Sequence, residues 1–113
     1  MFIDFCIFEK RIKLKLIEEN IDKIHSLCVQ YDIQSMHLFG SAISEYFSDS
    51  SDIDILISFK EIPFDKYTDN YFFLHEALEK LFDRKVDLIT ERSLSNPYFI
   101  QSIEKSKQLL YAA

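Results

Sequence analysis

The segment Leu38-Phe39-Gly40-Ser41, followed ten residues later by Asp52-Ile53-Asp54-Ile55-Leu56-Ile57, decides the fold class of this chain. In the first segment, apolar residues lead into a glycine, which predicts a strand that ends in a turn. The second segment alternates, so its isoleucines face one side of a sheet while Asp52 and Asp54 share the other side. Two carboxylates on one face of an otherwise apolar strand need a counter-charge, and no Lys or Arg is nearby in the sequence to supply it.

Helices and strands alternate along the rest of the chain. Apolar residues at helical spacing predict an amphipathic helix over 10–31 and another over 66–82, with Asp65 as the N-cap of the second. Asn96-Pro97 is a helix-start signal. The full expectation is helix 10–31, strand 35–39, short helix 42–47, strand 52–59, helix 66–82, strand 85–90, helix 97–105 and strand 108–111. This order predicts an α/β domain with helices covering at least one face of a small sheet.

Size and charge indicate one folded domain and exclude several classes of function. The chain has 113 residues, 48% hydrophobic and 28% charged, which predicts a single domain over 1–113 with 1–12 as an N-terminal extension. Its net charge of −6 argues against general nucleic-acid binding through basic residues. No stretch approaches the roughly 20 apolar residues that span a bilayer, and no signal peptide is recognisable, so no membrane association is expected.

Cysteines and aromatic residues add two expectations. Cys6 and Cys28 lie in apolar surroundings without metal-binding spacing, which predicts reduced core thiols in a cytoplasmic protein and no structural zinc. Eleven Phe and six Tyr are many for this length. Some of these aromatic side chains are expected on the surface, where they would suit a protein partner.

Three aspartates form the candidate catalytic and metal-binding set. Asp52 and Asp54 project side by side from one strand, and two close carboxylates suit Mg²⁺, which prefers oxygen ligands and keeps positions for water and phosphate. Asp87, on a later strand, could complete a site for two Mg²⁺ ions. Such a site activates an attacking hydroxyl and neutralises charge on a leaving pyrophosphate.

The Gly-Ser turn is the candidate phosphate-binding element. Gly40 lacks a Cβ and lets the backbone approach a triphosphate, while Ser41 and the amides of the turn can donate hydrogen bonds to phosphate oxygens. Ser51 is either a turn residue or a further nucleotide contact. No Walker-type loop or GxGxxG motif is present, and no nucleophile elbow accompanies the histidines, which are expected to be structural or exposed: His25, His37 and His75.

Some of these residues also have ordinary structural interpretations. Taken alone, Asp87 would be expected to form a salt bridge with Lys85 or Arg84. Asp52 alone could cap a loop at the start of a strand, although this does not explain a second charge at Asp54. The basic residues Arg84, Lys85 and Arg92 are more typical of a solvated surface than of phosphate ligands, but they flank the third aspartate.

Together these motifs resemble a known family. Phe-Gly-Ser, Ser-Asp-Ile-Asp-Ile-Leu-Ile and Lys-Val-Asp-Leu-Ile-Thr are similar to the minimal nucleotidyltransferase (MNT) group of the DNA polymerase β superfamily. The likeness runs from about Ile17 to Tyr111. It implies a mixed sheet with helices packed on it, nucleotide phosphates at Gly40 and Ser41, metals at Asp52 and Asp54, and Asp87 assisting the attacking hydroxyl.

The resemblance also implies a reaction and a partner. Many members of the group act as antitoxins of a HEPN protein, a helical ribonuclease toxin, and some add AMP units from ATP to a tyrosine of that toxin. We therefore expect an Mg²⁺-dependent transfer of AMP from ATP to a HEPN partner in a toxin–antitoxin pair. A homo- or hetero-oligomer is compatible with this role.

One departure from the family pattern keeps an alternative open. Members often carry Arg-Gly shortly after Gly-Ser, whereas this chain has Ser44-Glu45. The loss of a basic residue beside the phosphates would weaken nucleotide binding. The alternative is a binding module with an idle site that neutralises the toxin by contact. Transfer to a small molecule such as an aminoglycoside would need an added substrate domain, for which this chain has no residues.

Overall fold

The computed structural model describes residues 16–40 and 52–113. The predicted short helix at 42–47 lies outside these residues, as do Cys6, Ser41, Ser51 and the Ser44-Glu45 pair. Within the described ranges, no helix is long and apolar enough to cross a membrane.

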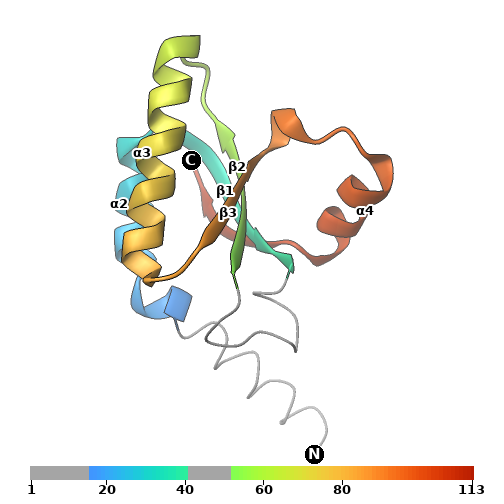
Figure 1. Cartoon of the computed structure of the whole chain (residues 1–113), viewed down its shortest axis with the longest axis horizontal. Coiled ribbons are helices and arrows are strands. Elements are labelled where there is room, and N and C mark those ends of the chain that lie inside the picture. The colour runs from blue at the N-terminus through green and yellow to red at the C-terminus, as the bar shows by residue number, and fades with distance from the viewer. Residues whose placement is uncertain (1–15, 41–51) are drawn as a thin grey trace, which may run out of the picture.

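A mixed four-stranded sheet forms the centre of the described chain (Figure 1). Its strands are β1 (Ile33–Phe39), β2 (Ile53–Phe59), β3 (Val86–Thr90) and β4 (Gln108–Ala112), in the order β3-β2-β1-β4. β1 pairs antiparallel with β2 and with β4, whereas β2 and β3 are parallel. A parallel pair needs a long crossover connection, which α3 (Phe64–Phe82) provides here.

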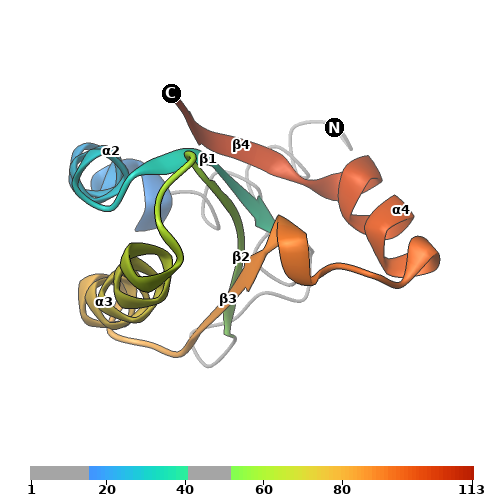
Figure 2. The ribbon, with the colours of Figure 1, turned by 90° about the horizontal axis from the view of Figure 1, so that it is seen from above.

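Helices lie on both faces of this sheet. α2 (Ile21–Gln30) and α3 cover one face, and α4 (Pro97–Ser106), which follows the short 3-10 helix η2 (Glu91–Ser93), lies on the other (Figure 2). The predicted helices and strands are thus confirmed in kind and order wherever the chain is described.

The main core fills the space between the sheet and the pair α2 and α3. The isoleucines of β2 point into it and are almost completely buried, as the alternation of the sequence predicted: Ile53, Ile55 and Ile57. Leu74 and Leu78 of α3 meet them from the helical layer. A smaller cluster on the opposite face joins Phe39, Leu56 and Ile103 of α4. The alternating residues of β2 therefore contribute to two different cores.

Two helix boundaries differ from the prediction. The helix predicted over 10–31 is interrupted at Asn20, and α2 begins only at Ile21. The backbone N–H of Asn20 donates to the Ile17 carbonyl at 3.1 Å and its side chain donates to the Leu16 carbonyl at 2.8 Å, which closes a tight turn between two helical segments.

The N-cap predicted for the second helix was also wrong. The cap position of α3 is Pro63, and Asp65 lies in the first turn. The N–H of Tyr67 donates to the Pro63 carbonyl at 2.9 Å and closes that turn. A negative charge in the first turn still favours the helix N-terminus, so Asp65 acts through the helix dipole and not as a cap.

Side chains of the helices satisfy backbone groups along both edge strands. On β3, the Tyr71 hydroxyl donates to the Leu88 carbonyl at 2.6 Å, and His75 Nε2 lies 2.8 Å from the Val86 carbonyl. On β4, His25 Nε2 lies 3.0 Å from the Leu110 carbonyl. These contacts give His25 and His75 the structural roles expected of them and reduce the tendency of exposed strand edges to pair with other chains.

Candidate functional site

Two of the three predicted aspartates lie side by side on the sheet. Asp54 of β2 is the register partner of Asp87 on β3 and of Phe39 on β1. Paired residues of adjacent strands project from the same face. The three side chains therefore form a row across the face opposite α2 and α3, and both carboxylates are half-buried.

Asp52 lies immediately before β2, two residues from Asp54, and is close to a basic residue. The N–H of Ile53 donates a hydrogen bond to the carbonyl of Lys85, the residue just before β3. This hydrogen bond places Lys85 beside Asp52. Lys85 Nζ lies 3.9 Å from Asp52 Oδ2. Lys85 thus pairs with Asp52 and not with Asp87, which was the structural alternative for the third aspartate. The sequence did not indicate this cation because Lys85 is 33 residues away along the chain.

Gly40 ends β1 directly beside Asp54. Its φ is +66°, a left-handed conformation that residues with a Cβ rarely adopt. A Cβ built at this position would overlap Oδ2 of Asp54. Glycine is therefore required here twice, for the backbone conformation and for the space that the carboxylate occupies.

α4 covers the rest of the same sheet face. Ile103 is 2% exposed and packs with Phe39 and Leu56. Phe99, one turn earlier in the helix, meets the Phe39 ring edge-on with the ring centroids 6.2 Å apart. The candidate site therefore has the aspartates of the strands on one side and Phe99 of α4 on the other.

The donor chemistry of this sheet face suits divalent metal. Asp52, Asp54 and Asp87 offer hard carboxylate oxygens at one end of one face, and Gly40 leaves the room that Asp54 needs. Within residues 16–40 and 52–113, no three carboxylate, His or Cys side chains converge closely enough to hold one ion among them. The structure therefore brings Asp54 and Asp87 together and turns Asp52 towards Lys85, and the shared metal site stays a prediction.

The third histidine lies away from this site. His37 is two residues before Phe39 on β1, below α4, and burial together with the charge of Lys107 lowers its pKa. His37 Nδ1 is buried and has no hydrogen-bond partner among the described residues. The predicted phosphate contacts Ser41 and Ser51 lie outside the described residues, so only Gly40 represents the phosphate-binding element here.

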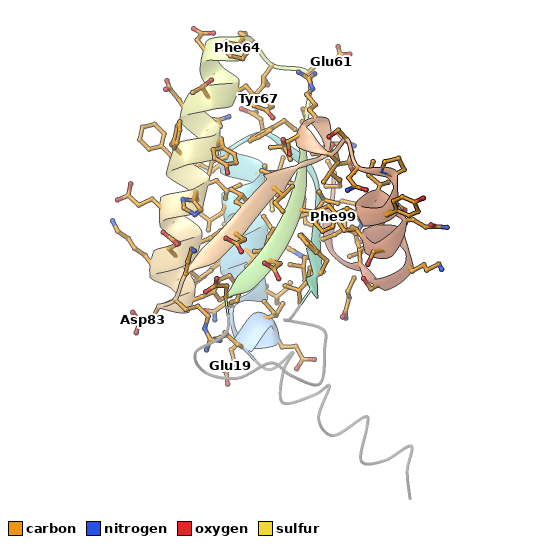
Figure 3. All side chains as sticks on the ribbon, turned by 45° about the vertical axis from the view of Figure 1, so that its right-hand side comes forward. Glu19, Glu61, Phe64, Tyr67, Asp83 and Phe99 are labelled. Carbon is orange, nitrogen blue, oxygen red and sulfur yellow. The ribbon has the colours of Figure 1, made fainter. Side chains whose placement is uncertain are left out.

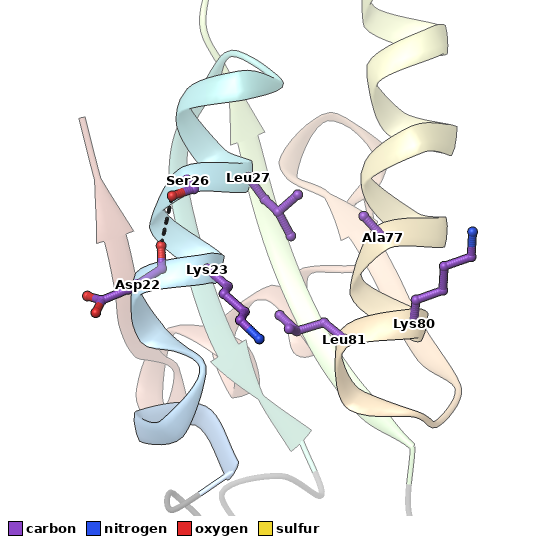
Figure 4. Close-up of a pocket in the computed structure, with 7 residues that line it drawn as sticks. All are labelled: Asp22, Lys23, Ser26, Leu27, Ala77, Lys80 and Leu81. Carbon is purple, nitrogen blue, oxygen red and sulfur yellow. Dashed lines mark hydrogen bonds between the residues drawn. The ribbon is translucent and has the colours of Figure 1, made fainter.

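A hollow of about 600 Å³ lies elsewhere, between α2 and α3 (Figure 4). Its lining is mostly apolar and includes Leu27, Ala77 and Leu81. The Ser26 hydroxyl, which also lines it, donates to the Asp22 carbonyl of its own helix. This hollow is separated from the aspartates Asp54 and Asp87 by the sheet, and its charged lining residues are one aspartate and two lysines: Asp22, Lys23 and Lys80.

Comparison with known proteins gives one family. The family model described as "Polymerase beta, Nucleotidyltransferase" matches residues 22–113. A relative from Methanocaldococcus jannaschii, provisionally named a protein adenylyltransferase, is 42% identical over 76 residues, which cover 67% of this chain and 75% of the relative. The range that the family model matches includes Asp52, Asp54 and Asp87.

Solved structures show the same arrangement of helices and strands. A chain of a crystal structure described as a toxin–antitoxin with AMP-PNP is similar with a TM-score of 0.65 at 26% identity, covering 83% of this chain and 74% of that one. A chain of the tri-AMPylated Shewanella oneidensis HEPN toxin in complex with MNT antitoxin is similar with a TM-score of 0.60 at 26% identity, covering 85% and 72%.

Proposed function

The chain belongs to the polymerase β nucleotidyltransferase family, and on that premise we propose that it transfers AMP from ATP to a partner protein, a HEPN toxin, as the antitoxin of a toxin–antitoxin pair. The predicted α/β fold with a small mixed sheet is confirmed. The whole chain, 1–113, would act as one minimal nucleotidyltransferase domain with 1–12 as an extension, in the cytoplasm where ATP is available.

The observation that carries this proposal is the row of acidic residues beside Gly40. Asp54 and Asp87 are register partners on one face, and Asp52 lies next to them. Gly40 has no Cβ, which leaves room for the Asp54 carboxylate. Buried or half-buried carboxylates are costly to keep together without a function or a counter-charge. Their position in a fold of this family favours nucleotidyl transfer over a purely structural role.

The residues divide the work of the reaction as follows. Divalent metal, two Mg²⁺ ions in our proposal, would be held by Asp52, Asp54 and Asp87 and would neutralise the triphosphate. Gly40, with Ser41 and Ser51, binds the phosphates. Asp87 accepts the proton of the acceptor hydroxyl.

The proposed transfer forms one bond and breaks another. The oxygen of the acceptor hydroxyl forms a bond to the α-phosphorus of ATP, while the bond from that phosphorus to the bridging oxygen of the β-phosphate breaks. Pyrophosphate leaves, and the acceptor retains AMP. Asp54, which lies between Phe39 and Asp87 on the sheet, would act on the nucleotide through the metal that it holds, because a carboxylate alone repels the phosphates.

A protein acceptor is supported by the related complexes and by the surface of this chain. Related proteins carry the name protein adenylyltransferase, and a similar chain lies in a complex of an MNT antitoxin with an AMP-modified HEPN toxin. Several large aromatic residues are exposed on α3 and α4, which is typical of a surface for protein partners: Phe64, Phe72, Phe73, Tyr98 and Phe99. A hetero-oligomer with the toxin follows from this proposal.

The test is transfer of label from α-³²P-ATP to a purified HEPN toxin in the presence of Mg²⁺. Asp54→Asn keeps the size of the side chain and removes its charge, and we expect it to lower the rate by at least about 100-fold. Asp22→Asn, which changes an exposed aspartate on α2, across the sheet from the site and on a different helix from the exposed phenylalanines, is the matched control and should retain the wild-type rate.

The second candidate, an idle binding module, predicts a different result. It would bind and neutralise the toxin without transferring label, and Asp54→Asn would neutralise as well as the wild type. Label transfer that is equal in the wild type and Asp54→Asn would refute the role of the acidic row. This second candidate is tested because Ser44-Glu45 stands where members of the family often carry Arg-Gly.

A further inference from the structure

We propose that Phe99 binds the base of the nucleotide, so that α4 supplies a stacking surface next to the catalytic aspartates. This inference rests on the proposed function, because it concerns the same nucleotide. It adds a residue outside the three aspartates and the Gly-Ser turn, which the sequence motifs did not single out.

The position of Phe99 follows from the register of the sheet. Asp87, Asp54 and Phe39 form one row across β3, β2 and β1, and the Phe39 ring meets Phe99 at its end. With strands about 4.8 Å apart, Phe39 lies one strand beyond Asp54 in the direction away from the edge strand β3. The ring centroid of Phe99 lies 6.2 Å from that of Phe39. In a nucleotide, the ribose separates the base from the α-phosphate. A base contact is therefore expected beside the carboxylates rather than on them.

The exposure of Phe99 leaves a surface for a ligand. Phe39 is buried, at 5% exposure, whereas Phe99 is 42% exposed although its ring contacts that of Phe39. An edge-on contact between two rings occupies the edge of one of them and leaves a ring face open. An open aromatic face next to a phosphate site is the kind of platform on which nucleobases stack.

α4 holds Phe99 in a defined place. Ile103, one turn further along the helix, is buried against Phe39 and Leu56. At the other end, the Asn96 side chain accepts hydrogen bonds from the N–H groups of Tyr98 and Phe99 itself, at 2.9 and 3.3 Å. A stacking residue on a capped and anchored helix is pre-organised, which lowers the entropic cost of binding.

The exposed phenylalanines of α3 do not compete for this role. Phe64, Phe72 and Phe73 lie on the helix that covers the opposite face of the sheet. Figure 3 shows Phe64 and Phe99 on different sides of the strands. Phe73 is 54% exposed, comparable to Phe99, and is therefore the matched control for loss of a surface phenyl ring.

The experiment measures the affinity of the full chain for two probes in the presence of Mg²⁺, ATP and inorganic tripolyphosphate, by isothermal titration calorimetry. Tripolyphosphate carries the phosphates without a base. We expect Phe99→Ala to weaken ATP binding by about 5- to 100-fold, the range for loss of one base–aromatic stack, and to leave tripolyphosphate binding unchanged. Phe99→Trp should restore ATP binding, and Phe73→Ala should match the wild type with both probes.

The other outcomes separate this inference from the proposed function. Wild-type protein that binds ATP while Phe99→Ala binds it equally well would overturn the stacking role and leave nucleotidyl transfer standing. Equal weakening of both probes by Phe99→Ala would show that the ring only supports the fold of the phosphate site, which also overturns the inference. Wild-type protein that binds neither probe would overturn the proposed function itself.

Discussion

Lys85 forms an ion pair with one of the acidic residues of the site. Its contact with Asp52 spans 3.9 Å, and both side chains are well exposed, at 68% and 41%. An exposed pair at this distance contributes little to stability. Lys85 therefore leaves Asp52 free to exchange this partner for metal or for the phosphates of a substrate, which a buried ion pair would resist.

Gly40→Ala tests whether the glycine is needed for the shape of the site. We expect the free energy of unfolding to fall by at least about 1 kcal/mol, because alanine disfavours a φ of +66°. The added Cβ would also displace the Asp54 carboxylate, so AMP transfer should be lost. Urea unfolding and the label-transfer assay measure the two effects.

Gly40→Asn separates the two reasons for glycine. Asparagine tolerates left-handed backbone better than alanine does, but it carries the same Cβ. This variant should recover part of the stability and none of the activity. An active Gly40→Ala or Gly40→Asn enzyme would contradict the close packing of Gly40 against Asp54.

Cys28 makes the stability of the fold sensitive to high pH. Burial raises the pKa of the Cys28 thiol from 9.0 to about 12. In the unfolded chain the thiol loses its proton near its usual pKa, whereas the folded protein retains it. The stabilising contribution is therefore complete below pH 9 and is lost as the pH rises towards 12, at up to about 1.4 kcal/mol per pH unit.

Cys28→Ala should remove this dependence. We expect the free energy of unfolding of the variant to fall less steeply with pH than that of the wild type between about pH 9 and 11. The comparison uses slopes, because the smaller side chain also lowers the stability at every pH. Parallel curves for the two proteins would show that Cys28 does not titrate in this way.

Among the helices, α4 is short, and its own signals determine where it begins. Asn96 caps it and Pro97 occupies the first position, as the sequence predicted. Only Ile103 of this helix is buried. A helix with one buried anchor depends on its cap more than α3 does, which buries four residues along its length.

Asn96→Ala should therefore lower the free energy of unfolding by about 1 kcal/mol, the usual cost of an N-cap that is lost. Asn96→Asp keeps an acceptor at the cap and should stay close to the wild type. Urea unfolding of the three proteins is the measurement. A loss of stability in Asn96→Asp as large as in Asn96→Ala would indicate that the side chain acts by another contact.

In the whole molecule, the sheet separates a structural layer from a functional one. The helices α2 and α3 lie on one face of the sheet and α4 lies on the other (Figure 2). The main core fills the space beneath α2 and α3, while Asp54 and Asp87 project from the face of α4. Substitutions of the aspartates therefore remove little of the apolar burial that stabilises the domain, since they leave both hydrophobic clusters in place. This separation explains why changes at the aspartates should affect activity without unfolding the protein.

Ligand binding at this face should stabilise the whole domain. ATP and Mg²⁺ together should raise the free energy of unfolding by about 2.7 kcal/mol at a hundredfold excess over the dissociation constant, seen as a shift of several degrees in the melting temperature. Asp52→Ala should fold and lose this shift. The absence of any shift in the wild type would favour the contact-only antitoxin, and an unfolded Asp52→Ala protein would show that the carboxylate is structural.

Local patterns in the sequence were sufficient for the strands, the helix order and the acidic residues. Alternation placed the isoleucines of β2 in the core and its aspartates on the opposite face, because side chains of a strand alternate regardless of its neighbours. The Asn96-Pro97 signal located α4, because a helix start depends on a few adjacent residues. Both features follow from interactions over a short stretch of chain.

Features that depend on distant residues became visible in the folded chain alone. The register places Asp87 and Phe39 on either side of Asp54, and a shift by one residue would turn all these side chains to the other face. The approach of Lys85 to Asp52 and the contact of Phe99 with Phe39 likewise depend on the packing of residues that are far apart in the sequence. No periodicity encodes such contacts, because they are chosen by the free energy of the whole arrangement and not by neighbouring residues.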